Sequence, residues 1–231
     1  MKVKGLIPSR FIYRLNRFMA IVELYGSRVL AHLPNSGRLL TALREGATAY
    51  IFERRSPHRR SSYDLFAIEH PDKTIIVDSR FSNTLAKTAI TEGLLDVLRG
   101  YRVVGENALI GDSRIDLLLE GVDGARFYVE VKSVTHAIDG VALFPDAPTI
   151  RGRKHLNQLR RLSLCGFNTG ILFSVQRSDA HMLKPNYEVD PKFCSALREA
   201  YESGVKIVAL KSTFIPPDVI ELDSDTLRFS F

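Results

Sequence analysis

The sequence predicts a two-domain protein of mixed α and β structure, in which a small β-barrel precedes a mixed sheet flanked by helices. Residues 10–78 contain short strand-like segments at regular spacing with little helix, which is typical of a barrel or sandwich. From Thr84 onward, helical periodicity alternates with apolar strand patterns, as in an α/β domain. With 231 residues, the chain can bury one large core or two smaller ones.

The polar segment 78–83 (DSRFSN) separates the two patterns and is rich in turn-forming residues. We therefore expect the domain boundary there, with residues 1–83 in the first domain and residues 84–231 in the second.

Six segments of the first domain are strand-like, namely 10–17, 19–25, 28–33, 47–54, 63–69 and 74–78. A five-stranded OB-like barrel fits this size, and such barrels often bind nucleic acid. Because one fold can carry many functions, the barrel alone does not establish that role.

The second domain follows the order helix, strand, hairpin, helix, strand, helix, strand. The expected helices are 84–99, 151–165 and 193–203, and the expected strands are 101–108, 113–119, 127–132, 169–175 and 205–210. Gly100 is expected to end the first helix and Thr149 to cap the second. This order predicts a mixed sheet covered by helices.

The expected hairpin brings two carboxylates and a lysine together. Asp123-Gly124 is a strong signal for a hairpin turn, and a turn centred there places Asp116 nearly opposite Glu130 on one face of the sheet. Lys132 follows two residues later on the same face. Because adjacent carboxylates repel each other, a cation is expected beside them.

An Asp, a turn and then Glu-x-Lys on the next strand is the pattern of PD-(D/E)xK nucleases. The carboxylates of Asp116 and Glu130 are expected to ligate Mg²⁺ or Mn²⁺, with water and a phosphate completing the shell. A bound metal lowers the pKa of its water, and Lys132 could orient that water or stabilise developing charge. The alternative is a solvated strand face, because so short a motif often occurs by chance. Burying an unpaired Asp116 in an apolar strand would be costly, which favours the catalytic interpretation.

Glu92 is a candidate for a third carboxylate of this metal site. It shares one side of the expected helix 84–99 with Asp96. Simple solvent exposure of both side chains is the alternative.

The positive charge of the chain is concentrated in its first third. Residues 1–83 hold 14 Lys and Arg against 7 Asp and Glu, whereas residues 84–231 hold 18 against 19. Such asymmetry favours a polyanionic partner, with DNA, double-stranded by preference, ahead of an anionic membrane surface. A basic domain without such a partner is the alternative.

Two loops of the first domain could deliver arginines to DNA. The segment 34–38 (PNSGR) presents Arg38, although it is equally well interpreted as a simple turn between elements. The segment 54–60 (RRSPHRR) contains four arginines and no acidic residue: Arg54, Arg55, Arg59 and Arg60. Arginine suits phosphate recognition, whereas a solvated basic loop is the alternative.

The helix expected at 151–165 is basic near its start. Arg151, Arg153 and Lys154 could hold DNA phosphates there. His155 is interpreted as a surface or phosphate contact rather than as a metal ligand.

Other features of the sequence favour a cytoplasmic protein. No segment is long and apolar enough to span a bilayer, and the basic start lacks the features of a signal peptide. Two cysteines, Cys165 and Cys194, are too few for a disulfide framework or a zinc site. The sequence leaves a homodimer open.

Four segments give the chain a specific resemblance to a known family, namely HLPNSGRL (32–39), SRID (113–116), YVEVKSVT (128–135) and FPDAPTIRGRKHL (144–156). On these segments the sequence resembles the sugar fermentation stimulation protein (SfsA) family over essentially its full length. The resemblance implies an OB-like N-terminal domain joined to a PD-(D/E)xK nuclease-like domain. It also implies DNA binding largely without sequence preference, and a role in regulating sugar (maltose) metabolism.

Carried onto this sequence, the resemblance implies a nuclease-like centre of Asp116, Glu130 and Lys132. Arg114, Arg151 and His155 lie in matching motifs, and these residues complete the set of expected DNA contacts together with those named above. The segment 78–83 departs from the Asp-Thr…Pro-Asn form of the family, because serines occupy the altered places.

Two functions follow from the sequence. One is a Mg²⁺-dependent deoxyribonuclease, acting internally or from ends. The other is a DNA-binding regulator built on a nuclease fold with little or no turnover. A protein that acts only by recruiting another regulator is a third and weaker alternative.

Overall fold

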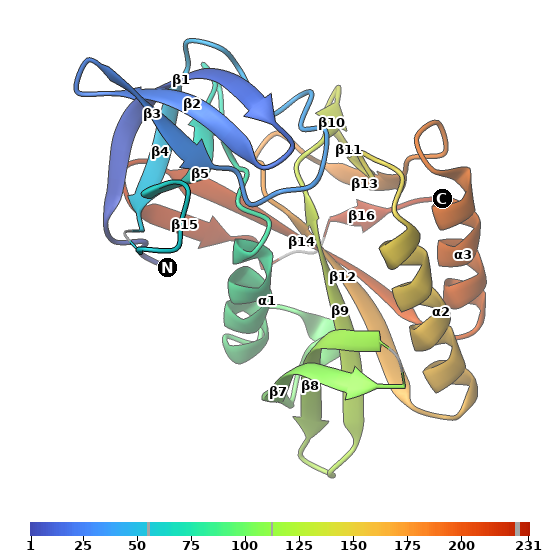
Figure 1. Cartoon of the computed structure of the whole chain (residues 1–231). Coiled ribbons are helices and arrows are strands. Elements are labelled where there is room, and N and C mark those ends of the chain that lie inside the picture. Colours follow the sequence, from blue (N-terminus) through green and yellow to red (C-terminus); the bar gives the residue numbers. More distant parts are fainter. Residues whose placement is uncertain (55, 112, 225–226) are drawn as a thin grey trace.

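A computed structural model of the chain describes residues 1–54, 56–111, 113–224 and 227–231. It contains a barrel, a central mixed sheet with helices on both faces, and a small second sheet (Figure 1). The two-domain architecture expected from the sequence is therefore confirmed.

The first domain is a barrel in which strands run in the order β3-β2-β1-β4-β5-β6. The strands are β1 (Leu6–Asn16), β2 (Met19–Leu24), β3 (Ser27–His32), β4 (Thr48–Glu53), β5 (Tyr63–Glu69) and β6 (Thr74–Ile76). A parallel pairing of β3 with β5 closes β1–β5 into the five-stranded barrel that the sequence predicts. Alternate residues of β2 are buried, as expected for a strand with one face in a core.

The central sheet has the order β15-β14-β12-β9-β8-β7. Its strands are β7 (Tyr101–Ile110), β8 (Ser113–Gly121), β9 (Arg126–Val134), β12 (Asn168–Val175), β14 (Lys206–Ile215) and β15 (Val219–Leu222). Strands β9, β12 and β14 are parallel, whereas β7, β8 and β15 are antiparallel to their neighbours. The predicted mixed sheet and its central hairpin are thus confirmed.

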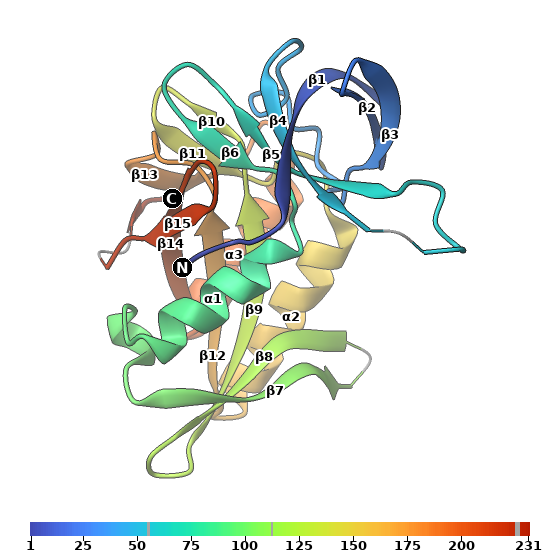
Figure 2. The same cartoon turned by 90° about the vertical axis from the view of Figure 1, so that its left-hand side faces the viewer.

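Helices cover both faces of this sheet (Figures 1 and 2). Helix α1 (Phe81–Thr91) lies on the face that also meets the barrel, while α2 (Ile150–Leu164) and α3 (Pro191–Glu202) lie on the other face. The hydroxyl of Thr149 accepts a hydrogen bond from Gly152 N at 3.0 Å, so Thr149 caps α2 as predicted.

The prediction of one helix over residues 84–99 is wrong at both ends. Helix α1 begins at Phe81 and ends at Thr91, and a short 3₁₀ helix, η1 (Asp96–Leu98), follows it. Gly93 has φ +68° and donates to Ile90 O, while Leu94 N donates to Ala89 O. These bonds form a Schellman motif, which stops the helix seven residues before the predicted Gly100.

A small sheet with the order β10-β11-β13-β16 was not predicted. Its strands are β10 (Ala137–Ile138), β11 (Val141–Phe144), β13 (Met182–Pro185) and β16 (Arg228–Phe229). Strands of two to four residues are too short for an alternating pattern to be recognised.

The two domains share a hydrophobic core rather than meeting through a polar linker. Phe66 of β5 is fully buried and makes edge contacts with Phe81 of α1 and Phe214 of β14, at ring-centroid distances of 5.2 and 5.5 Å. Tyr50 of β4 also contacts Phe214, at 5.3 Å. This core holds the barrel against the central sheet and so determines the shape of the space between them.

Candidate active site

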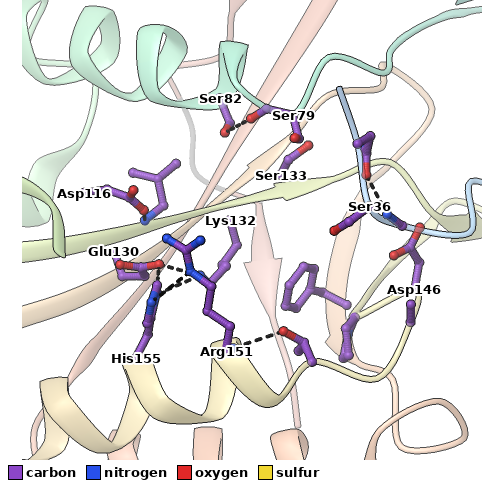
Figure 3. Close-up of a pocket in the computed structure, with 18 of the residues that line it drawn as sticks. Ser36, Ser79, Ser82, Asp116, Glu130, Lys132, Ser133, Asp146, Arg151 and His155 are labelled. Carbon is purple, nitrogen blue, oxygen red and sulfur yellow. Dashed lines mark hydrogen bonds and ion pairs between the residues drawn. The ribbon is translucent and has the colours of Figure 1, made fainter. Parts of the chain in front are cut away.

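A pocket of about 660 Å³ lies between the two domains. It is lined by β8 and β9, by the N-terminal ends of α1 and α2, and by loops of the barrel. Figure 3 shows Asp116 and Glu130 on one side of this pocket and Ser36 and Asp146 on the other, with Lys132 and Arg151 between them. The structure therefore brings together the three residues of the predicted centre.

Asp116 occupies the place where the hairpin strands part. The pairing of β8 with β9 ends at Leu117 opposite Val129, so the predicted register is correct up to the last pair before Asp116 and Glu130. Asp116 Oδ2 then accepts a hydrogen bond from Val131 N at 2.9 Å, while Oδ1 lies 3.5 Å from the amide of Asn83 on α1. The Asp116 carboxylate thus accepts a hydrogen bond from a backbone N–H of β9 at the point where the pairing of β8 with β9 ends.

Glu130 is 1% exposed, and only one of its two carboxylate oxygens forms hydrogen bonds with the described residues. Its Oε1 is bonded by both Lys132 Nζ and the His155 ring. Its Oε2 is buried and has no hydrogen-bond partner among the described residues. Although burial opposes ionisation, Lys132 and His155 hold the pKa of Glu130 below its usual value. A buried carboxylate oxygen without a partner is a free ligand position.

The electrostatics of Asp116 differ from those of Glu130. Burial raises the pKa of Asp116, and the negative charge of Glu130 raises it further. A divalent cation beside both groups would remove this repulsion.

His155 belongs to this centre and is not the surface contact that the sequence predicted. It is buried on α2, and its Nε2 accepts a hydrogen bond from Arg151 Nε at 3.3 Å. Because Nε2 is an acceptor, Nδ1 carries the proton and donates it to Glu130. The periodicity of α2 contained the signal, since the neighbouring Leu156 and Leu159 mark the buried face of the helix.

Glu92 is not brought to the centre. It is the exposed C-terminal cap of α1, whereas Asn83 at the other end of that helix lines the pocket. Nine residues of α-helix separate the two by roughly 14 Å. The prediction depended on a helix that continued past Glu92, and Gly93 ends it.

Two arginines of the basic loop 54–60 contact residues of the barrel itself. Arg59 is paired with Asp64, which is 1% exposed, and the Arg54 guanidinium lies 4.8 Å from the Phe52 ring centroid. Arg60 is exposed, and Arg55 lies outside the described residues. Arg59 is therefore engaged in an ion pair within the barrel, and its predicted contact with DNA stays a prediction.

The other predicted DNA contacts divide into two groups. Arg151 lines the pocket. Arg38, Arg114 and Lys154 are exposed but do not line it. Arg153 Nη1 lies 3.5 Å from a carboxylate oxygen of Asp190, the N-cap residue of α3. Arg153 therefore has an acidic partner that is distant in sequence and could not be seen in the local pattern.

Two arginines that the sequence analysis did not select also line the pocket. Arg17 follows β1, and Arg80 precedes α1. Arg80 bonds both oxygens of Asp78 at 2.9 and 2.7 Å and reaches Asp64 at 2.8 Å, yet its side chain remains 53% exposed. Only the contact between domains brings Arg17 into the same pocket as Glu130, so no local pattern could have identified it.

Among the described residues, every helix is too short or too polar to cross a bilayer.

Comparison with known proteins places these features in a family. Residues 80–217 match the family described as "Sugar fermentation stimulation protein RE domain", and residues 12–77 match "SfsA N-terminal OB domain". The chain is 40% identical over 216 residues to a sugar fermentation stimulation protein homolog of Moorella thermoacetica, covering 93% of each chain. It is 39% identical over 206 residues to a homolog of Clostridium kluyveri, covering 89% of this chain and 90% of the relative.

A solved structure is also similar over the whole chain. It is described as Pyrococcus furiosus SfsA in complex with Ca²⁺ and has a TM-score of 0.92 at 30% identity. The match covers 100% of this chain and 98% of that one.

Proposed function

We propose, since the chain belongs to the sugar fermentation stimulation protein (SfsA) family, that it binds DNA largely without sequence preference and hydrolyses phosphodiester bonds with Mg²⁺ or Mn²⁺. The observation that carries this proposal is the buried, unpartnered Oε2 of Glu130 beside Asp116, in a pocket that also contains Lys132.

The residues present fit a hard divalent cation. Asp116 and Glu130 supply carboxylate oxygens, and Mg²⁺ is commonly held by one or two carboxylates together with water and substrate phosphate. No group of three His, Cys, Asp or Glu side chains in the described parts of the chain is close enough to enclose a metal. A site of two carboxylates suits Mg²⁺ or Mn²⁺ better than zinc, which prefers His and Cys. The Ca²⁺ in the Pyrococcus furiosus relative supports a divalent cation in this family.

The metal would lower the pKa of a bound water and offset charge on the phosphate. Lys132 would orient the attacking water or stabilise the charge that develops on the phosphate. His155 would hold Glu130 in place through its Nδ1–H, because Arg151 fixes the tautomer of the ring.

The pocket also offers cations to the DNA backbone. Arg17 and Arg151 line it, and so does Arg80, whose guanidinium binds Asp78 and Asp64 but stays 53% exposed. Arginine forks suit phosphate oxygens. Contacts to phosphate position a strand but read no bases, which agrees with binding largely without sequence preference.

A catalytically silent, DNA-binding regulator of sugar (maltose) metabolism is the alternative, and one observation favours it. Lys132 is held in an ion pair with Glu130 and is only 14% exposed, so it is not free to activate water in this arrangement. A protein that used the centre only structurally would bind DNA without cutting it.

The experiment that separates these functions is incubation of the purified chain with linear, circular and single-stranded DNA in Mg²⁺, Mn²⁺ or EDTA. Glu130→Gln is compared with Glu92→Gln, which makes the same chemical change outside the pocket. Metal-dependent cutting that Glu130→Gln abolishes and Glu92→Gln preserves would support the nuclease. Retarded but intact DNA in every lane would favour the regulator.

A further inference from the structure

We infer that the pocket receives the end of a single DNA strand, because the segment Pro34–Thr41 of the barrel closes the side of the pocket opposite the carboxylates. We call this segment the wall. The inference deepens the proposed function and rests on it, since it names the substrate class of the same centre.

The wall is fixed to the segment that links the domains. The Asn35 side-chain amide donates to Val77 O at 3.0 Å. On the same side, Ser79 donates to Pro34 O through its hydroxyl at 2.6 Å and through its backbone N at 3.2 Å. These bonds tie the wall to the segment that precedes α1.

The wall is also fixed across the pocket to the second domain. Leu39 N donates to Asp146 Oδ2 at 3.1 Å, and the Thr41 hydroxyl lies 3.2 Å from His136 Nδ1. A Cβ added to Gly37 would lie 2.7 Å from Asp146 Cγ, so the wall backbone is in direct contact with that carboxylate. Residue 37 must be glycine because a side chain there would collide with Asp146. The backbone conformation is not the reason, because the φ of Gly37 lies outside the left-handed region.

Arg14 holds the wall from behind. Its guanidinium donates to the carbonyls of Gly37, Arg38 and Arg17 at 2.8, 2.7 and 2.7 Å. Gly37 and Arg38 belong to the wall and Arg17 follows β1, so one planar guanidinium ties the wall to the end of β1.

The consequence for a DNA strand follows from where the wall stands. Asp116 and Glu130 lie on one side of the pocket. Ser36 of the wall and Asp146, which contacts the wall, lie on the other side (Figure 3). If a DNA phosphate binds at the carboxylates, the nucleotides between it and the wall must fit inside the pocket. The pocket volume of about 660 Å³ is the size of a small-molecule site. A strand held at the carboxylates meets the wall and Asp146 on the opposite side of the pocket, and this barrier favours a strand that ends there over one that continues in that direction. Arg17 and the hydroxyl of Ser36 line the pocket and are then available to the terminal nucleotide.

The first test measures binding in Ca²⁺, without relying on turnover. The full chain is titrated with a single-stranded oligonucleotide carrying 2-aminopurine at its 5′ end, at its 3′ end or in the middle, and with a ligated circle of the same sequence. We expect a fluorescence change for one of the two terminal positions, and none for the internal position or the circle. An equal change for the internal position and the circle would show that the pocket accepts an uninterrupted or flipped-out strand, and would overturn the inference.

The second test alters the wall. Gly37→Ala pushes the wall away from Asp146, whereas Gly105→Ala is a matched control whose added Cβ would lie 3.5 Å from Leu118, an ordinary contact. Asp146→Ala opens the same contact by removing atoms, in case Gly37→Ala fails to fold. In Mg²⁺ the unaltered chain is expected to cut the circle roughly a hundredfold more slowly than the linear strand, the scale of loss for a misplaced reacting group. The ratio of the cutting rate of the linear strand to that of the circle should fall in Gly37→Ala and Asp146→Ala. The same ratio should be unchanged in Gly105→Ala.

The two tests distinguish the two proposals. If no DNA is cut, hydrolysis fails, while the fluorescence titration still decides whether strand ends enter the pocket. If the circle and the linear strand are cut at equal rates by the unaltered chain, hydrolysis stands and the selection of ends is refuted.

Discussion

Replacing Asp179 by asparagine is expected to weaken the contact between the domains in a pH-dependent way. Asp179 accepts two hydrogen bonds from Arg177, at 2.8 and 2.7 Å, and lies 3.2 Å from Lys73 of the barrel. Arg177 is 3% exposed and also donates to Thr41 of the wall at 3.0 Å. Asp179 therefore supports a buried arginine that joins the two domains.

The size of the effect follows from the pKa of Asp179. Although burial opposes ionisation, Arg177 and Lys73 lower this pKa from 3.8 to about 2. The difference corresponds to about 2.5 kcal/mol. Because the carboxylate is 25% exposed, solvent screening reduces the expected loss to about 1–2 kcal/mol.

The sign of the pH dependence is fixed by the direction of the shift. A carboxyl whose pKa is lower in the folded state contributes stability above its unfolded pKa, near 3.8, and loses it as pH falls toward 2. About half of the contribution should remain at pH 3. The difference between Asp179→Asn and the unaltered chain should therefore be full at pH 7 and about half as large at pH 3.

Urea unfolding at pH 7, 5 and 3 measures this difference directly. Asp96→Asn serves as the control, because Asp96 is 85% exposed and its loss should change the free energy of unfolding by less than about 0.5 kcal/mol. A loss for Asp179→Asn that is the same at pH 3 as at pH 7 would refute the assignment of its stabilising role to the ionised carboxylate.

Three other variants test the centre, the shared core and the DNA contacts. His155→Ala removes the donor that holds Glu130, so the metal concentration for half-maximal binding should rise by about 10–100-fold in a titration; an unchanged midpoint would exclude the positioning role. Phe66→Ala opens a cavity in the core between the domains and should cost about 3–5 kcal/mol in chemical denaturation, and a loss below about 1 kcal/mol would contradict the packing described for it. Arg151→Gln should lower the slope of log binding constant against log salt by about 0.7 for single-stranded DNA, measured by anisotropy, and an unaltered slope would remove Arg151 from the phosphate contacts.

Local rules explain why much of the fold could be predicted. The Asp123-Gly124 turn signal and the alternation of both strands predict the hairpin, and the observed pairs Glu120–Arg126 and Leu117–Val129 agree with Asp116 and Glu130 sharing a face. The cap at Thr149 followed from its hydroxyl at the start of a helical pattern. Both depend only on residues close in sequence.

Contacts between distant residues explain what could not be predicted. The end of α1 depends on the Schellman bonds at Gly93, yet apolar residues continue past it and suggested a longer helix. The wall looked like an ordinary turn, because Asp146 contacts it from more than a hundred residues away. The periodicity of α2 marks His155 as buried, but only the packing of α2 against β9 brings it to Glu130.

The arginines of the first domain show why charge counts mislead in detail. The excess of positive charge suggested a surface for DNA, but Arg14 and Arg59 serve the protein itself by holding the wall and pairing with buried Asp64. A guanidinium that donates to three backbone carbonyls has few hydrogen atoms left for phosphate. Arg17 lines the pocket instead, three residues away from Arg14 and indistinguishable from it by charge. Salt dependence of binding should therefore reflect the few arginines that line the pocket, and should be shallower than the net charge of the domain suggests.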